Sequence, residues 1–195
     1  MNPFVKQTTK LVMGCIANER LAQENLYKLF YAEMLRLCNR YLKSDDLAME
    51  ALNTGFLKIF QNINSFDQQK GELHTWIKTI IVRTCIDLNR KELKFSAEKT
   101  DFAEADEVFV SPSVLEKLYA EDLVKSIRIL PAATQVVFNL YVVDGYSHKE
   151  IGEQLNIGES TSRGHLTEAK KKLRELLKPQ GKSNEYPTEQ NPKEK

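Results

Sequence analysis

Residues 147–173 have the sequence SHKEIGEQLNIGESTSRGHLTEAKKKL, and this stretch decides the fold of the C-terminal part of the chain. Ser147 and Glu150 match a capping box, in which the serine hydroxyl accepts from the Glu150 amide while the Glu150 carboxylate reaches back. A short helix is therefore predicted to start at Ser147 and to stop at Asn156. Because Gly158 then precedes a longer helical run, the stretch predicts a helix-turn-helix.

Apolar and charged side chains along the two predicted helices support this interpretation. Four apolar residues are spaced to wedge the helices together at a steep angle, namely Ile151, Leu155, Ile157 and Leu166. From residue 159 to 178, six basic side chains outnumber three acidic ones, which is typical of a helix that binds DNA phosphates. An ordinary helical hairpin with a charged outer face is the alternative, and the capping box and apolar spacing disfavour it.

Helical periodicity extends toward the N-terminus. Apolar residues recur every three or four positions over residues 23–41, 45–63 and 72–93, which is the period of a helix with one buried face. Pro131 suits the first turn of a further helix, which Gly145 ends. With only 8 Gly and 6 Pro, the chain has few turns for an all-β fold, so we expect an all-α protein.

Composition divides the chain into two small helical domains. Residues 95–112 lie in an acidic stretch that resembles a flexible linker. We therefore expect a first domain over residues 1–94, the acidic linker over 95–112, a second domain over 113–178 and a disordered tail over 179–195. A linker of this length lets the two domains lie at variable separations in the free protein.

Composition and cysteine usage exclude several classes of protein. A net charge of +1 excludes a uniformly basic coat. The cysteines, Cys15, Cys38 and Cys85, are odd in number and widely spaced, so we expect small apolar residues on helix faces and no disulfide framework or zinc site. No apolar run approaches the length of a membrane span, and the N-terminus does not match a secretory signal. We therefore expect a soluble, cytoplasmic protein.

The histidines suggest no catalytic site. His74, His148 and His165 are scattered along the chain, without a zinc-protease motif, a phosphate-binding glycine loop or a nucleophile elbow. Each is expected to be a surface or DNA-facing residue. The sequence accordingly predicts no enzyme, no metal site and no cofactor.

Two blocks of the chain, taken together, resemble bacterial RNA polymerase sigma factors of the extracytoplasmic-function (ECF) group in the sigma-70 family. Residues 130–173 look like region 4, which binds the minus-35 promoter element. Region 2, which grips the polymerase clamp and melts the minus-10 element, is matched by ERLAQENLYKLFYAEMLRLCNRYL, EALNTGFLKIFQNINSF and LHTWIKTIIVRTCIDLNRK. The resemblance implies a region 2 helical bundle and a region 4 helix-turn-helix joined by a flexible acidic linker.

The resemblance also implies a function and partners. The chain would be a transcription initiation factor without catalytic activity, which binds core RNA polymerase at the β′ clamp and β flap and directs it to specific promoters. An anti-sigma factor is a further expected partner. A stand-alone helix-turn-helix DNA-binding transcriptional regulator is the alternative, and it is disfavoured because such a protein has no need for the single-strand-binding character of residues 76–91.

Site residues follow from the resemblance, position by position. Contacts to core polymerase are expected at Glu50, Asn53, Phe56 and Leu57. Minus-10 DNA contacts are expected at Phe66, Lys70, Trp76, Lys78, Arg83 and Arg90. Minus-35 DNA contacts are expected at Thr161, Arg163, Gly164, His165, Thr167, Glu168, Lys170 and Lys171.

Three of these positions have a second interpretation. Phe56 is either a polymerase contact or a core residue, and Trp76 is either a stacking platform for a base or a core residue. Glu168 either accepts a hydrogen bond from a cytosine amine or pairs with Lys172 one turn along the helix.

Overall fold

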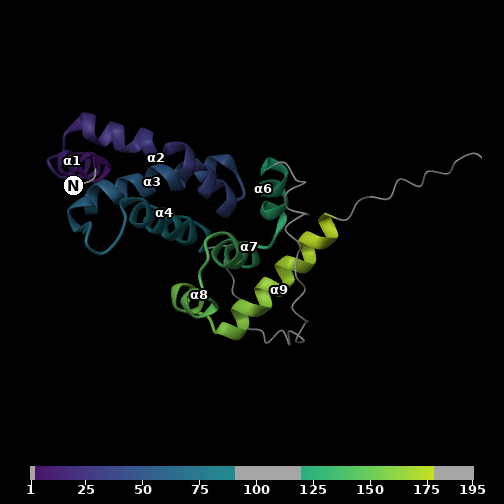
Figure 1. The fold of residues 1–195 in the computed structure, drawn as a ribbon. Helices are drawn as coiled ribbons and strands as arrows, with labels where there is room; N and C mark the ends of the chain where they lie inside the picture. Colours follow the sequence, from purple (N-terminus) through teal and green to yellow (C-terminus); the bar gives the residue numbers. More distant parts are fainter. Residues whose placement is uncertain (1–2, 91–119, 178–195) are drawn as a thin grey trace, which may run out of the picture.

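The computed structural model describes residues 3–90 and 120–177, and within these ranges all regular elements are helical (Figure 1). Residues 3–90 form α1 (Pro3–Ile16), α2 (Arg20–Tyr41), α3 (Asp45–Asn62), the 3-10 turn η1 (Ile63–Ser65) and α4 (Leu73–Asn89). Residues 120–177 form α6 (Ala120–Ile129), α7 (Ala132–Phe138), the π-helical turn η2 (Asn139–Val143), α8 (His148–Leu155) and α9 (Glu159–Leu176). The predicted all-α fold of two helical domains is confirmed, while the predicted linker and tail lie outside the described residues.

The N-terminal domain is a bundle in which α2, α3 and α4 share an apolar core. Ser44 caps α3 by accepting a hydrogen bond from the Leu47 amide at 3.2 Å, and Asp45 and Asp46 in the first turn complement the helix dipole. Large side chains of this core that have no solvent exposure include Tyr41, Leu26, Met34, Leu52, Ile59, Ile77 and Ile81. Cys38 and Cys85 are buried in this domain, which confirms their expected role as small apolar residues.

Helix α1 was not predicted from the sequence. It packs against α2, and its side chains Val12 and Cys15 are buried. Gly14 permits this contact, because a Cβ added there would lie 2.6 Å from the Ala22 Cβ. The two helices therefore approach closely at a point that apolar periodicity alone does not reveal.

The helix-turn-helix of the C-terminal domain forms as predicted. The Ser147 hydroxyl accepts from the Glu150 amide at 3.3 Å, and the Ser147 amide donates to the Glu150 carboxylate at 2.8 Å, which completes the capping box. Asn156 ends α8 with a φ of 56°. A Cβ at Gly152 would lie 2.8 Å from the Ile157 carbonyl oxygen, so only glycine lets the turn fold back this closely.

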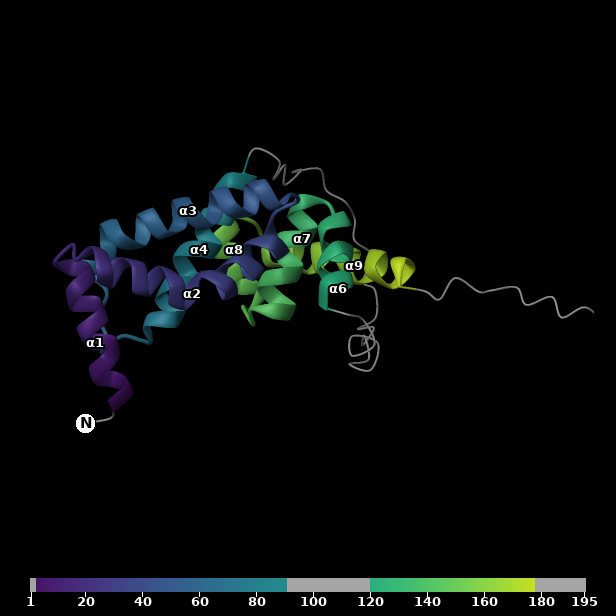
Figure 2. The same ribbon diagram turned by 90° about the horizontal axis from the view of Figure 1, so that it is seen from above.

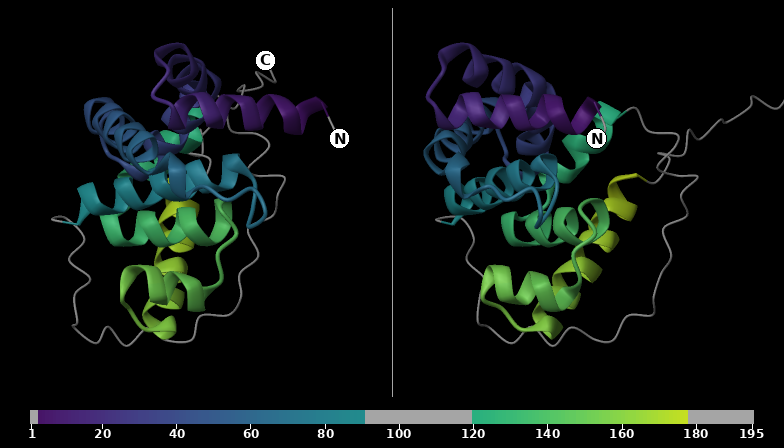
Figure 3. Two further views of the ribbon diagram at one scale, coloured as in Figure 1. Left: turned by 90° about the vertical axis from the view of Figure 1, so that its left-hand side faces the viewer. Right: turned by 60° about the vertical axis from the view of Figure 1, so that its left-hand side comes forward.

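Helix α7 lies at the centre of the molecule. Residues 132–138 are all buried, because α9 packs on this helix and the N-terminal domain also contacts it (Figures 1 and 3). The single helix predicted over residues 131–144 is instead divided into α7 and the wider turn η2. Gly145 then ends the segment with a φ of 78°, as predicted.

The two domains pack directly on each other. In Figures 2 and 3 the C-terminal domain, green to yellow, lies beside the ends of α2 and α4. The contact includes hydrogen bonds from Arg128 of α6 to Asn39 and from Gln135 of α7 to the Arg40 carbonyl oxygen. These contacts join residues that are far apart in the sequence, and the variable separation expected from the linker stays a prediction.

Candidate nucleic-acid interface

Helix α9 presents a cationic outer surface to solvent. The Arg163 side chain is 64% exposed and pairs with its helix neighbour Glu159 at 3.0 Å, an exposed ion pair of the kind that contributes little free energy. Lys171, two turns further along, is also exposed. Both cations are therefore available to a polyanion without any rearrangement of the domain.

The opposite side of α9 faces the protein interior. Ser162, Leu166 and Ala169 are buried there, and so is Gly164, one of the predicted minus-35 contacts. His165 is half-buried, with its Nδ1 3.4 Å from the Thr134 hydroxyl of α7, and burial lowers the pKa of His165. Gly164 and His165 thus belong to the packed side of the helix.

The remaining predicted minus-35 residues lie between these two faces. They are half-buried and comprise Thr161, Thr167, Glu168 and Lys170. Glu168 pairs with Lys172 at 2.7 Å and accepts a hydrogen bond from Thr134 at 3.2 Å. Burial raises the pKa of Glu168, but the hydrogen bond and charge of Lys172, together with the Thr134 hydrogen bond and His165, outweigh it and hold the pKa below its ordinary value. Of its two interpretations, the pair with Lys172 is the one present in the structure.

His148 braces the two helices of the motif, a role that the sequence did not suggest. Its Nδ1 lies 2.8 Å from the buried Ser162 hydroxyl of α9, and its ring stacks on Tyr141 with centroids 4.3 Å apart. Burial and, next, the positive charge of Arg163 lower the pKa of His148. A neutral imidazole therefore joins α8 to the face of α9 that lies under the exposed cations.

The predicted minus-10 residues are distributed along α4 and the segment before it. Phe66 and Trp76 are half-buried and pack on each other with ring centroids 5.6 Å apart. Phe66 and the exposed Lys70 line a cavity of about 730 Å³ that also includes apolar Leu29 and Phe30. Trp76 therefore packs on Phe66 and keeps part of its surface exposed, and its role as a stacking platform for a base stays a prediction.

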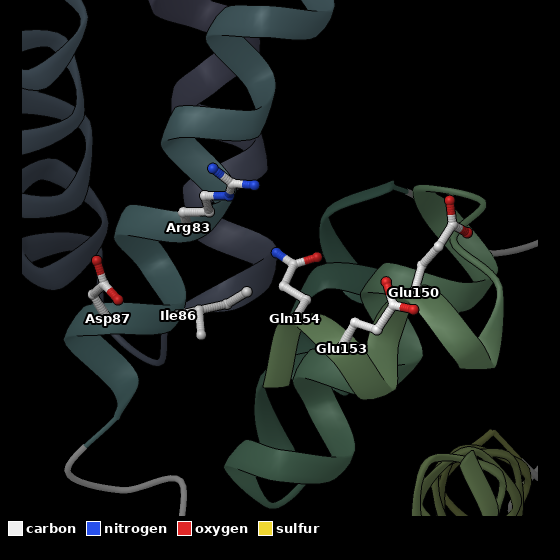
Figure 4. Close-up of a pocket in the computed structure, with 6 residues that line it drawn as sticks. All are labelled: Arg83, Ile86, Asp87, Glu150, Glu153 and Gln154. Atoms are coloured by element: carbon white, nitrogen blue, oxygen red, sulfur yellow. The ribbon is translucent and has the colours of Figure 1, made fainter. Parts of the chain in front are cut away.

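Further along α4, the cations have different surroundings. Arg83 is exposed and lines a cleft opposite Glu150 and Glu153 of α8 (Figure 4). Arg90 is exposed at the C-terminal end of the helix. Lys78, in contrast, pairs at 2.9 Å with Asp144 of the C-terminal domain. The structure therefore does not bring all six predicted minus-10 residues into one surface.

Three of the four predicted polymerase contacts form an exposed surface on α3. Glu50, Asn53 and Leu57 are exposed, and Leu57 is an apolar side chain with 57% exposure. Phe56 is only 2% exposed, and its ring packs on Tyr27 with centroids 4.6 Å apart. Phe56 is thus a core residue in this structure, beneath the surface made by the other three.

The described residues provide neither a metal cluster nor a membrane span. Among them, no three His, Cys, Asp or Glu side chains are grouped so that they could hold a metal ion. None of the helices in this part of the chain has both the length and the apolar character needed to cross a membrane.

Comparison with known proteins adds family matches to this geometry. Residues 26–94 match the family model of Sigma-70 region 2, and residues 120–173 match that of Sigma-70, region 4. The ECF RNA polymerase sigma factor SigW of Bacillus subtilis is 27% identical over 193 residues, which covers 91% of this chain and 99% of SigW. ECF RNA polymerase sigma factor SigM of Mycobacterium tuberculosis is 21% identical and covers 88% of this chain and 85% of SigM.

A solved structure shows the same fold. The sigma factor RpoE of Bartonella quintana, crystallised in complex with the anti-sigma factor NepR, has a TM-score of 0.51 and 19% sequence identity. The similarity covers 81% of this chain and 99% of that one. Together the two family matches span more than half of the chain and are in the order of the two described domains. The chain belongs to the sigma-70 family, in the ECF group, and is a transcription initiation factor that directs RNA polymerase to promoters.

Proposed function

We propose that the chain recognises promoters through two separate surfaces, one on each domain. The outer surface of α9 contacts the minus-35 element, with Arg163 reading a base edge and Lys171 holding phosphate. The observation that carries this proposal is the contrast between the two sides of α9, since the interior side is packed and the outer side presents exposed cations. Arginine commonly reads guanine in the major groove, while lysine on phosphate is insensitive to sequence.

The N-terminal domain acts on the minus-10 element. Phe66 and Trp76 provide aromatic surface beside the exposed Lys70, and Arg83 and Arg90 extend the cationic surface along α4. A protein that melts DNA needs both features, because an extruded base must be stacked and the separated backbone must be neutralised. Lys78 can contact DNA on this surface only when its ion pair with Asp144 is broken.

Core polymerase binds to the exposed surface of α3. Glu50 and Asn53 lie three positions apart and so share one helix face, and the exposed apolar Leu57 lies one turn further along. This surface contacts the β′ clamp, and the C-terminal domain contacts the β flap. We place the functional units at residues 1–94 and 113–178, joined by a linker at 95–112 and followed by a tail at 179–195.

Other features of the proposal rest on the relatives. The relative RpoE binds an anti-sigma factor, and an anti-sigma factor is a corresponding partner for this chain. Sigma factors act on polymerase in the cytoplasm and are not enzymes, so we assign a cytoplasmic location and no catalytic activity. A stand-alone regulator is disfavoured, because such a protein does not require the region 2 match over residues 26–94.

The polymerase surface provides a direct test. The double variant Glu50→Ala with Asn53→Ala should weaken binding to purified core RNA polymerase about tenfold or more, as measured by fluorescence anisotropy. Its thermal stability should stay nearly unchanged, since both positions are exposed. The matched control is Glu24→Ala with Asn25→Ala, which removes the same two residue types from the exposed side of α2.

Two results would contradict the proposal. If the double variant binds core polymerase as tightly as the control does, the α3 surface is not the docking site. If the unaltered chain fails to bind core polymerase and yet binds duplex DNA alone, the stand-alone regulator is favoured. If the unaltered chain does bind core polymerase, run-off transcription with reconstituted holoenzyme on genomic fragments would identify its promoters.

A further inference from the structure

Tyr27 of α2 reaches a residue of the proposed polymerase surface on the neighbouring helix α3. The two helices pack along each other in the N-terminal bundle (Figures 1 and 2). The Tyr27 hydroxyl donates a hydrogen bond to Oδ1 of Asn53 at 3.2 Å. Because 26 positions separate the two residues in the chain, no local sequence pattern reveals this contact.

The half-buried Tyr27 side chain is anchored by aromatic packing. Its ring lies against that of Phe56, with centroids 4.6 Å apart and an angle of 59° between the planes. Phe56 is only 2% exposed and also contacts Phe60, with centroids 6.0 Å apart. Tilted aromatic pairs at these separations are favourable. The core of the bundle therefore fixes the position from which the Tyr27 hydroxyl donates.

The direction of this hydrogen bond determines what Asn53 offers to a partner. Burial and, next, the neighbouring Tyr31 raise the pKa of Tyr27, so the phenol keeps its proton at neutral pH and donates it. A side-chain amide has one oxygen that accepts and one NH2 group that donates twice. Since the Asn53 oxygen accepts from Tyr27 and the side chain is exposed, the amide offers its N–H groups at the surface.

Another asparagine on the same helix uses its amide differently. Asn62 donates from Nδ2 to the Lys58 carbonyl oxygen at 2.8 Å, a local contact with the preceding turn. Asn53 instead accepts from a different helix. Asparagine is a poorer helix former than alanine, and burial does not offset that cost at an exposed position in the middle of α3. Contact with a partner therefore explains Asn53 better than helix stability does.

The exposed side chains of α3 then form a directional pattern. Glu50 offers carboxylate acceptors, Asn53 offers amide donors and Leu57 offers an apolar side chain. Steps of three and four positions place all three on one face of the helix. A partner that fits this face has a donor opposite Glu50, an oxygen acceptor opposite Asn53 and an apolar group opposite Leu57.

We propose that Tyr27 is a positioning residue for polymerase binding, which fixes the Asn53 amide so that its N–H groups meet an oxygen acceptor on core RNA polymerase. The proposal rests on the proposed role of the α3 surface in docking polymerase. An amide that is already oriented loses less conformational freedom when the complex forms. Phe56 contributes from the core, because it anchors the ring of Tyr27 and does not itself contact the polymerase.

Removal of one hydroxyl group tests this positioning role. Tyr27→Phe keeps the ring against Phe56 and should weaken binding to purified core RNA polymerase about three- to tenfold, as measured by fluorescence anisotropy. Its thermal stability should stay nearly unchanged, because the lost hydrogen bond lies at an exposed site. The matched control Tyr31→Phe removes a hydroxyl one turn further along α2, keeps the ring that contacts Tyr27, and should not change the affinity.

A double-mutant cycle distinguishes positioning of Asn53 from a direct contact of Tyr27 with polymerase. Asn53→Ala should weaken binding by at least as much as Tyr27→Phe does. In the Asn53→Ala background, Tyr27→Phe should have less than about a twofold further effect, because the hydroxyl then has no amide to orient. Asn53→Asp keeps an oxygen toward Tyr27 but replaces the outward N–H groups with a second oxygen. It should therefore bind core polymerase no more tightly than Asn53→Ala.

The outcomes separate this inference from the proposed function. If Glu50→Ala with Asn53→Ala weakens binding, the docking surface stands, and the inference is overturned by any of three results. These are an unchanged affinity of Tyr27→Phe, an equal effect of Tyr27→Phe with and without Asn53→Ala, or tighter binding by Asn53→Asp than by Asn53→Ala. If the Glu50 and Asn53 double variant binds as tightly as its control, the proposed docking surface is wrong and the inference fails with it.

Discussion

The two surfaces proposed to bind promoter DNA differ in how their cations are satisfied. On α9, Arg163 pairs only with a neighbour one turn away on the same helix, and its side chain is mostly exposed. On α4, Lys78 is paired with Asp144, a buried carboxylate from a residue 66 positions further along the chain. The cations of the minus-35 surface are therefore satisfied within one domain, whereas one cation of the minus-10 surface, Lys78, is held by the other domain.

This difference shows how cationic side chains acquire different roles from their surroundings. A surface pair within one helix contributes little free energy and is easily exchanged for a phosphate. A buried pair is held by several groups at once, and removing one partner leaves an uncompensated charge. The first surface should respond to single substitutions locally, while the second should respond through the whole molecule.

The largest expected effect comes from opening a cavity in the core of each domain. Ile151→Ala removes a fully buried side chain from the helix-turn-helix, and Ile77→Ala does the same in the N-terminal bundle. Each should lower the free energy of unfolding by about 2–5 kcal/mol, measured by urea denaturation. Ile151→Ala should abolish minus-35 binding as well, while the exposed Lys149→Ala serves as a control with little effect. A loss below about 0.5 kcal/mol for either isoleucine variant would contradict the packing described.

The next effect distinguishes an α9 side chain that contacts a base from one that contacts only phosphate. Arg163→Ala should weaken binding to the preferred minus-35 duplex by about 1–3 kcal/mol and relax its specificity. Lys171→Ala should weaken binding to all sequences alike and lower the slope of log affinity against log salt by about one. Anisotropy titrations on a set of minus-35 variants would measure both. Equal effects of the two substitutions on every duplex would show that Arg163 holds only phosphate.

A smaller effect is expected at the capping box that begins α8 in the helix-turn-helix. Ser147→Ala removes the hydroxyl that accepts from the Glu150 amide, which should cost about 1 kcal/mol of stability. Thermal unfolding would measure this loss, and Ser147→Asp should restore most of it because aspartate is also a good cap. If alanine and aspartate prove equally stable at this position, the capping box does not stabilise α8.

The smallest effect is a pH dependence confined to the C-terminal domain. Burial lowers the pKa of both His148 and His165 below the ordinary value of 6.5. The unfolded chain therefore binds protons first, so the stability that these neutral rings contribute is present above about pH 6.5 and is lost as the pH falls through their folded pKa values. Thermal unfolding between about pH 7.5 and 5 should show this loss of stability, and His148→Gln should reduce the slope of stability against pH. If the slope of stability against pH is the same in the variant as in the unaltered chain, His148 does not contribute to the pH dependence.

Much of the candidate site could be predicted from the sequence because it is encoded locally. The capping box at Ser147, the end of the helix at Asn156 and the DNA-facing Arg163 were all expected from residue types within a few positions of one another. Phe56 shows the limit of this reasoning, since the sequence left it open between a polymerase contact and a core residue, and only the structure shows the ring buried beside Tyr27. Helical periodicity defines which residues share a face but not which neighbouring helix covers it.

By itself, the sequence determined the helical class, the helix-turn-helix and the membership in two sigma factor regions, because helix caps, apolar spacing and turn residues act over short distances. Only the tertiary structure decided that α1 packs on α2, that His148 braces α8 against α9 and that Asp144 reaches Lys78 and Arg40. The physical reason is that a buried charge is defined by its surroundings. A carboxylate at the end of a helix looks like an ordinary surface residue in the sequence, and it becomes the centre of an interface only when another domain supplies its counter-charges.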